Sequence, residues 1–153
     1  MLVIIDLQEY YESEFRKQKK KFKRMLSHIL KRIDQAEKNE EPIINLTHVY
    51  DGFTIYEVVE ELKNKDNVHF LEKEGFDGSA SVHFYSKRRK LNTNSIELCG
   101  AFYDCCVLKT WQGLKDREYN VQPVNPSLTI RTSKQRKIKY PNGYFTEEIK
   151  DGF

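Results

Sequence analysis

Cys106 is the residue of this sequence best suited to act as a nucleophile. It follows a short apolar run, Ile96 to Cys99, and a glycine, Gly100, and it lies in the first turn of a helix predicted to start near Cys105. A thiol there is close to unpaired backbone N–H groups and to the positive end of the helix dipole, both of which favour the thiolate. Because the thiolate is the nucleophilic form, this pattern indicates covalent chemistry at Cys106.

Two charged residues follow apolar strands elsewhere in the chain. Asp6 ends the run Leu2-Val-Ile-Ile5, and Lys73 lies just past Val68-His-Phe-Leu71. Taken singly, Asp6 could equally be a helix cap, and a lysine after a strand is usually only exposed. Since the carboxyl ends of parallel strands share one edge of a sheet, however, we expect both to lie near Cys106. The ammonium would stabilise a thiolate, and the carboxylate could carry the thiol proton to a leaving amine.

The elements that would position these residues follow from apolar spacing. Strands and helices alternate along the chain, which predicts an α/β fold with a parallel sheet and right-handed crossovers. The expected strands are residues 2–5, 42–46, 68–71, 96–99 and 119–124. Long helices are expected at residues 12–39 and 105–116. A short helix should begin at a capping box formed by Thr54 and Glu57, another should lie within 76–91, and a last helical turn is expected at 146–150.

Composition narrows the class of protein. The 153 residues fit one domain, 1–153, with a formal net charge of +3 and apolar runs too short to cross a membrane. Three cysteines, two of them adjacent, form neither a disulfide framework nor a zinc ribbon, and the start of the chain does not read as a signal peptide. We therefore expect a cytoplasmic protein.

Three motifs resemble those of the isochorismatase-like cysteine hydrolases, the family of nicotinamidases and related amidohydrolases. Leu2-Val-Ile-Ile-Asp-Leu-Gln8 is similar to the opening strand of that family. Phe70-Leu-Glu-Lys73, followed by Gly75-Phe76, resembles the strand that carries its lysine. Gly100-Ala-Phe-Tyr-Asp-Cys-Cys-Val107 resembles its nucleophile elbow. The motifs occur in the family's order and strand context, and the resemblance spans about residues 1 to 130.

The resemblance implies a three-layer αβα fold around a doubly wound, mostly parallel, Rossmann-like sheet. The fold is expected to be compact and shortened at its C-terminal end. It also implies an Asp6-Lys73-Cys106 triad that cleaves a small amide through a cysteine thioester. Cys106 would attack the carbonyl carbon, Asp6 would shuttle the proton, and Lys73 would hold both electrostatically. A homodimer or higher oligomer is common in the family, and no cofactor is expected.

Further site residues come from the same resemblance. Backbone N–H groups of Phe102 and Cys106 would form the oxyanion hole, and the Ala101–Phe102 peptide bond is expected to be cis. Tyr11 corresponds to a family aromatic that lines the substrate pocket, together with Ala101 and Phe102.

The sequence also departs from the family pattern. Nicotinamidases carry an aspartate and histidines for a metal after the second strand, whereas Thr47-His-Val-Tyr-Asp-Gly-Phe53 lacks such a set, so we predict no metal and regard His48 as structural. The segment between the second and third strands is short, which predicts an open or differently shaped pocket. The chain also ends soon after the fifth strand, and Phe102 and Cys105 are unusual at their positions.

These departures leave other functions open. The chain could be a non-catalytic relative that uses the fold for binding or oligomerisation. Basic runs at 17–24, 86–90 and 134–139 raise a third possibility, contact with nucleic acid, although the low net charge makes it the less favoured one. Redox sensing by the adjacent Cys105 and Cys106 ranks last, because the C-x-x-C spacing is missing.

Overall fold

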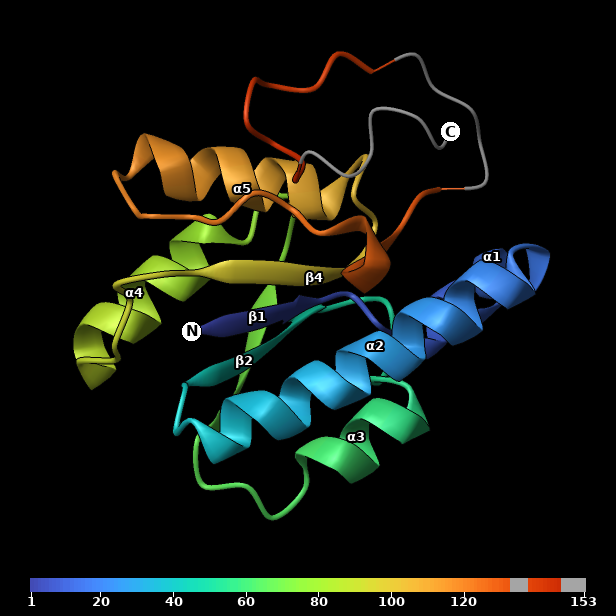
Figure 1. The fold of residues 1–153 in the computed structure, drawn as a ribbon, viewed down its shortest axis with the longest axis horizontal. Coiled ribbons are helices and arrows are strands. Elements are labelled where there is room, and N and C mark those ends of the chain that lie inside the picture. Colours follow the sequence, from blue (N-terminus) through green and yellow to red (C-terminus); the bar gives the residue numbers. More distant parts are fainter. Residues whose placement is uncertain (133–137, 147–153) are drawn as a thin grey trace.

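A computed structural model describes residues 1–132 and 138–146. A five-stranded sheet lies between two layers of helices (Figure 1). The strands are β1 (Leu2–Ile5), β2 (Ile43–His48), β3 (Val68–Lys73), β4 (Glu97–Ala101) and β5 (Thr129–Ile130). They pair in the order β3-β2-β1-β4-β5, and every pair is parallel. The predicted three-layer α/β fold is confirmed.

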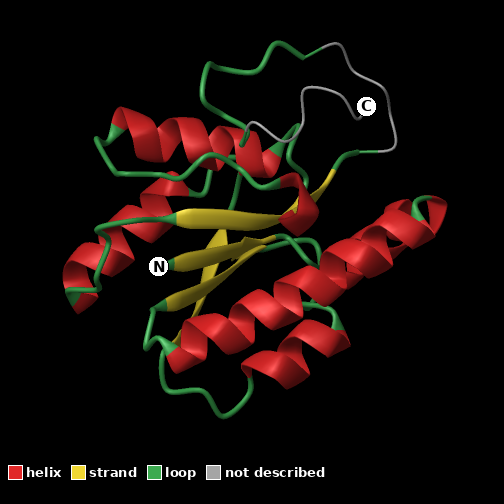
Figure 2. Cartoon of the chain, in the orientation of Figure 1, coloured by secondary structure: helices red, strands yellow, loops and turns green. Residues whose placement is uncertain are grey.

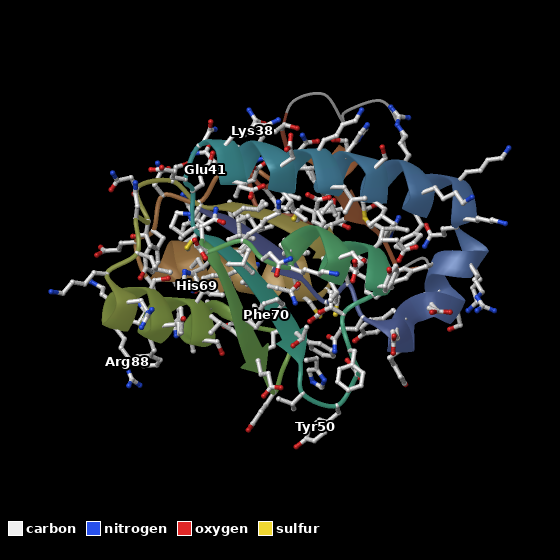
Figure 3. The ribbon with its side chains drawn as sticks, turned by 90° about the horizontal axis from the view of Figure 1, so that it is seen from below. Lys38, Glu41, Tyr50, His69, Phe70 and Arg88 are labelled. Carbon is white, nitrogen blue, oxygen red and sulfur yellow. The ribbon has the colours of Figure 1, made fainter. Side chains whose placement is uncertain are left out.

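The helices cover both faces of this sheet (Figure 2). They are α1 (Glu12–Lys17), α2 (Lys19–Lys38), α3 (Tyr56–Leu62), α4 (Ser79–Arg89) and α5 (Cys106–Asp116), with short 3-10 turns η1 (Glu9–Tyr11) and η2 (Pro126–Leu128). In a view turned by 90°, α2 and α4 lie on opposite sides of the strands, and Phe70 is exposed on the edge strand β3 (Figure 3). Helices on both faces are what a parallel sheet requires.

The central strand β1 explains this arrangement best. All four of its side chains are buried, and alternate residues point to opposite faces of the sheet. Leu2 and Ile4 join a core with α2 and α3, whereas Val3 and Ile5 join a second core with α4 and α5. A strand that is apolar throughout therefore occupies the middle of the sheet, and Asp6 follows it directly.

Two predicted helices differ from those observed. The helix expected over residues 12–39 is divided at Gln18, whose backbone leaves the helical region (φ −119°, ψ 34°) and whose Nε2 donates to the backbone oxygen of Arg131 at 2.7 Å. The predicted capping box is wrong. Thr54 Oγ1 instead accepts a hydrogen bond from Asn45 Nδ2 at 2.7 Å, and α3 begins at Tyr56.

Gly100 does not end its strand, as the sequence suggested, but lies within β4 beside Ile5. Its φ is +107°, and a Cβ there would lie 2.2 Å from the backbone oxygen of Ile5. Only glycine allows this close approach of β4 to β1.

The predicted fifth strand at residues 119–124 is also wrong. Val121 forms one parallel bridge with Ile96, and the pairing stops at Pro123, which has no N–H to donate. The chain then turns through η2 and pairs again as β5.

The helical turn predicted at 146–150 lies almost wholly outside the described residues. Within the described part of the chain, no helix combines the length and apolar character needed to cross a lipid bilayer.

Candidate active site

Asp6 and Lys73 form a buried ion pair at the carboxyl edge of the sheet. Lys73 Nζ lies 2.8 Å from Asp6 Oδ2, and the two side chains are 1% and 0% exposed. Lys73 is the last residue of β3 rather than the residue after it, and its Nζ also donates to the backbone oxygen of Gly75 at 2.9 Å. The Lys73 side chain thus reaches across β2, from the edge strand β3 to Asp6 at the end of β1.

Cys106 is the first residue of α5, and it lies beside this pair. The thiol is close enough to the side chains of Cys105, Asp6 and Lys73 for all three to affect its pKa, and Cys106 is only 3% exposed. The structure thus brings together all three residues that the sequence singled out, from the ends of β1 and β3 and the start of α5.

Burial dominates the electrostatics of Asp6. Desolvation raises the pKa of its carboxyl, while the charge of Lys73 and the neighbouring Cys106 thiol act in the opposite direction. The Asp6 backbone has a positive φ of 50°, and its N–H donates to the backbone oxygen of Leu46 at 3.0 Å. Asparagine and aspartate tolerate this conformation better than most residues, which fits an acidic group held at the end of a strand.

The pKa of the Cys106 thiol is raised, contrary to the expectation of a stabilised thiolate. The hydrogen bond with Cys105, burial and the charge of Asp6 all raise it, and Lys73 only partly opposes them. The charge of Lys73 therefore does not outweigh the combined effect of Cys105, burial and Asp6 on the pKa of the Cys106 thiol. In the resting site Cys106 is a thiol, and it needs a base at the moment of attack.

The residues that the resemblance assigned to the substrate pocket lie near Asp6 and Cys106. The Tyr11 ring meets the Phe102 ring edge-on at a centroid distance of 5.2 Å, and the Ala101–Phe102 peptide bond is cis, as the resemblance implied. Phe102 is buried, and its backbone oxygen accepts from the N–H groups of Cys105 and Val107. Ala101 is the last residue of β4 and is fully buried.

Sequence reasoning missed Asp51, which holds Tyr11 in place. Tyr11 Oη donates to Asp51 Oδ2 at 2.5 Å, and His48 Nδ1 lies 3.1 Å from the same oxygen. Burial and this hydrogen bond raise the pKa of the Tyr11 hydroxyl. The clue lay in the spacing after β2, where an aspartate follows His48 by three residues.

Gln8 fixes the same loop. Its Nε2 donates to the backbone oxygens of His48 and Gly52, and its Oε1 accepts from the His48 N–H at 2.8 Å. His48 Nε2 contacts the backbone oxygen of Glu74 at 2.9 Å. His48 thus serves the loop structurally, and no group of three His, Cys, Asp or Glu residues that could hold a metal occurs among residues 1–132 and 138–146.

Solved structures similar to this chain include three named enzymes. The nicotinamidase of Staphylococcus aureus shares 20% identity at a TM-score of 0.66 over 84% of this chain and 80% of its own. The N-carbamoylsarcosine amidase of Thermoplasma acidophilum shares 15% identity at 0.66 over 87% and 84%. The MAR1 ribonuclease of Caenorhabditis elegans shares 24% identity at 0.68 over 86% of this chain but 65% of its own.

At these identities the likeness shows the fold alone. No curated protein sequence matches the chain. The family profile described as the isochorismatase domain, in contrast, matches residues 1–125, which include Asp6, Lys73 and Cys106. The chain therefore belongs to the isochorismatase family.

Proposed function

We propose that this protein is a cysteine hydrolase that cleaves an amide-type C–N bond of a small molecule. One observation carries the proposal. The buried Asp6 carboxylate has the Lys73 ammonium 2.8 Å away on one hand, and the Cys106 thiol close enough for the two groups to affect each other's pKa on the other. A carboxylate with these two neighbours can accept the thiol proton while its own position is held by the lysine.

In the proposed reaction, Cys106 Sγ forms a bond to the carbonyl carbon as its proton passes to Asp6. The negative charge that develops on the carbonyl oxygen is stabilised by the backbone N–H groups of Phe102 and Cys106. Asp6 then gives its proton to the nitrogen as the C–N bond breaks. Ammonia or an amine departs, and the acyl group stays bound to Cys106 as a thioester. Water, deprotonated by Asp6, attacks the thioester and releases the acid, and the thiol regains its proton.

The raised pKa values fit this sequence of proton transfers. A carboxyl whose pKa is raised by burial is a stronger base than an exposed aspartate, which suits a group that must take a proton and return it. Lys73 is a positioning residue in this mechanism, because it acts through Asp6. Tyr11, Ala101 and Phe102 would line the substrate.

The family and its neighbours support the same reaction class. Two of the similar structures are named a nicotinamidase and an N-carbamoylsarcosine amidase, names that denote cleavage of C–N bonds.

The other candidate function is that of a non-catalytic relative with the same fold. The near-complete burial of Asp6, Lys73 and Cys106 favours it, because a substrate must still reach the thiol.

Ammonia release separates the two candidates. We would incubate the parent protein with a panel of small carboxamides that includes nicotinamide, and measure ammonia and the mass of acid-quenched protein. A hydrolase releases ammonia and shows a thioester adduct on the peptide containing Cys106. Cys106→Ala should abolish both, Asp6→Asn should lower the rate by at least about 100-fold, and Cys99→Ala, which removes a thiol from the core, should retain activity. Binding without turnover across the panel would instead identify a non-catalytic relative.

A further inference from the structure

A second, cationic pocket lies at the start of α2, beside the η2–β5 segment. Its volume is about 290 Å³. Two hydrogen bonds fix its walls to each other, since Gln18 Nε2 donates to the Arg131 backbone oxygen at 2.7 Å and His28 Nδ1 lies 3.3 Å from the Ser127 backbone oxygen. Neither Asp6, Lys73 nor Cys106 lines it, so it is separate from the proposed active site.

The lining of this pocket is positively charged. Lys21 and Arg24 are three residues apart on α2, so they lie on one face of the helix, and Arg131 enters from the opposite wall. No acidic residue is among the described lining residues. Asp104 lies close to one of the cations, with Arg131 Nε 3.7 Å from its Oδ2, and it also accepts hydrogen bonds from Thr132. Among residues 1–132 and 138–146, three cationic side chains line the pocket and one carboxylate lies beside it, a balance that favours an anionic ligand.

Thr129 supplies an independent observation. It lines the pocket, it is only 5% exposed, and its Oγ1 has no hydrogen-bond partner within residues 1–132 and 138–146. A buried hydroxyl without a partner costs about 1–3 kcal/mol, so such groups normally meet a protein atom, water or ligand. A ligand oxygen in the pocket would accept a hydrogen bond from this hydroxyl.

We propose that this pocket binds the phosphate group of a small phosphorylated molecule. A phosphate monoester carries nearly two negative charges and three acceptor oxygens, which match the guanidinium groups of Arg24 and Arg131, the Lys21 ammonium and the Thr129 hydroxyl. Met25 and Ile130 provide an apolar surface for the rest of the ligand. The volume is at the lower end for ligand pockets, about 300–1,000 Å³, which favours a small ligand.

A polynucleotide fits the same charges less well. The basic run at 17–24 does not form one continuous stripe, because Lys21 and Arg24 line this pocket whereas Lys19 and Lys23 line another that also contains Glu9 and Glu12. A backbone of many phosphates would need a continuous row of cations along its path.

Calorimetric titration tests the proposal with ribose 5-phosphate as the probe and ribose as the matched ligand that lacks the phosphate. At 150 mM salt we expect saturable binding of one ribose 5-phosphate per chain and none of ribose. Lys21→Gln/Arg24→Gln should weaken binding by about tenfold or more. Thr129→Val should weaken it by about fivefold, and Thr129→Ser, which keeps the hydroxyl, should restore it.

The charge-matched control is Lys20→Gln/Lys23→Gln, which removes two positive charges from the same helix outside the pocket. Binding in this control should stay within about twofold of the parent. Equal weakening in both double variants would overturn the proposal, as would the absence of ribose 5-phosphate binding in the folded parent. Tighter binding of a short single-stranded RNA, steeply salt-dependent and lost equally in both double variants, would replace the pocket with a polynucleotide surface.

Discussion

Two groups of charged side chains lie near the carboxyl edge of the sheet, and they differ in their exposure to water. Asp6 and Lys73 are almost completely buried and lie 2.8 Å apart, so each depends on the other for compensation of its charge. Lys21 and Arg24, in contrast, are exposed at the rim of a pocket. A cation as exposed as Arg24 can exchange surrounding water for a ligand at little cost to the fold. Buried charged side chains such as Asp6 and Lys73 hold a fixed position instead, which suits the proton transfer proposed for the Asp6 carboxylate.

The largest effect that tests this difference is the loss of one buried partner. Lys73→Met leaves the Asp6 carboxylate buried without its ammonium, and we expect the free energy of unfolding to fall by about 3–5 kcal/mol. Urea denaturation measures this value. Lys38→Met breaks an exposed pair, Lys38 Nζ to Asp34 Oδ2 at 2.7 Å, and should cost less than about 0.5 kcal/mol. Similar losses in the two variants would mean that burial does not separate the two groups of charges.

Close backbone packing beneath Asp6 is the second requirement of the buried group. Gly100→Ala places a Cβ 2.2 Å from the backbone oxygen of Ile5, at a φ of +107° that alanine rarely adopts. We expect a loss of about 2–4 kcal/mol in the free energy of unfolding, from strain and displacement of β4. Gly75→Ala is the control, since a Cβ added at that position would have no other atom within 4 Å. A Gly100→Ala protein as stable as the control would show that β1 and β4 can separate freely.

The sequence predicted the buried group better than the packing around it. Leu2–Ile5 is apolar at every position, which is typical of a central parallel strand and places Asp6 at the sheet edge. β5 has only two residues, Thr129 and Ile130, too few for a periodic pattern, whereas the apolar residues near Val121 suggested a strand that Pro123 interrupts. The raised pKa of Cys106 depends on burial and neighbours, which a sequence does not show.

The pH dependence of stability sharpens the comparison further. Because the pKa of Asp6 is raised in the folded protein, the folded chain holds a proton that the unfolded chain releases at about pH 4. The contribution of Asp6 to stability is therefore fully present below pH 4 and is lost as the pH rises through the folded pKa. Asp6→Asn does not titrate, so its stability relative to the parent should increase with pH, by at most about 1.4 kcal/mol per unit.

Urea denaturation of both proteins between pH 3.5 and 7 measures that difference. Asparagine suits the positive φ at this position, so the backbone should be retained. A parent that gains stability relative to Asp6→Asn as the pH rises would show that Lys73 stabilises the carboxylate more than burial destabilises it.

The smallest expected effect lies at the exposed pocket. Arg24→Gln removes a cation from the pocket rim, where water can replace its contacts, and we expect a change of less than about 0.5 kcal/mol in the free energy of unfolding. Measured without ligand in the same urea series, this variant should be nearly indistinguishable from the parent. A loss above about 1 kcal/mol would mean that Arg24 is part of the folded structure's own charge network. A neutral result means instead that the charge is available to a ligand, because a cation that contributes little to folding can bind phosphate without first breaking a stabilising contact.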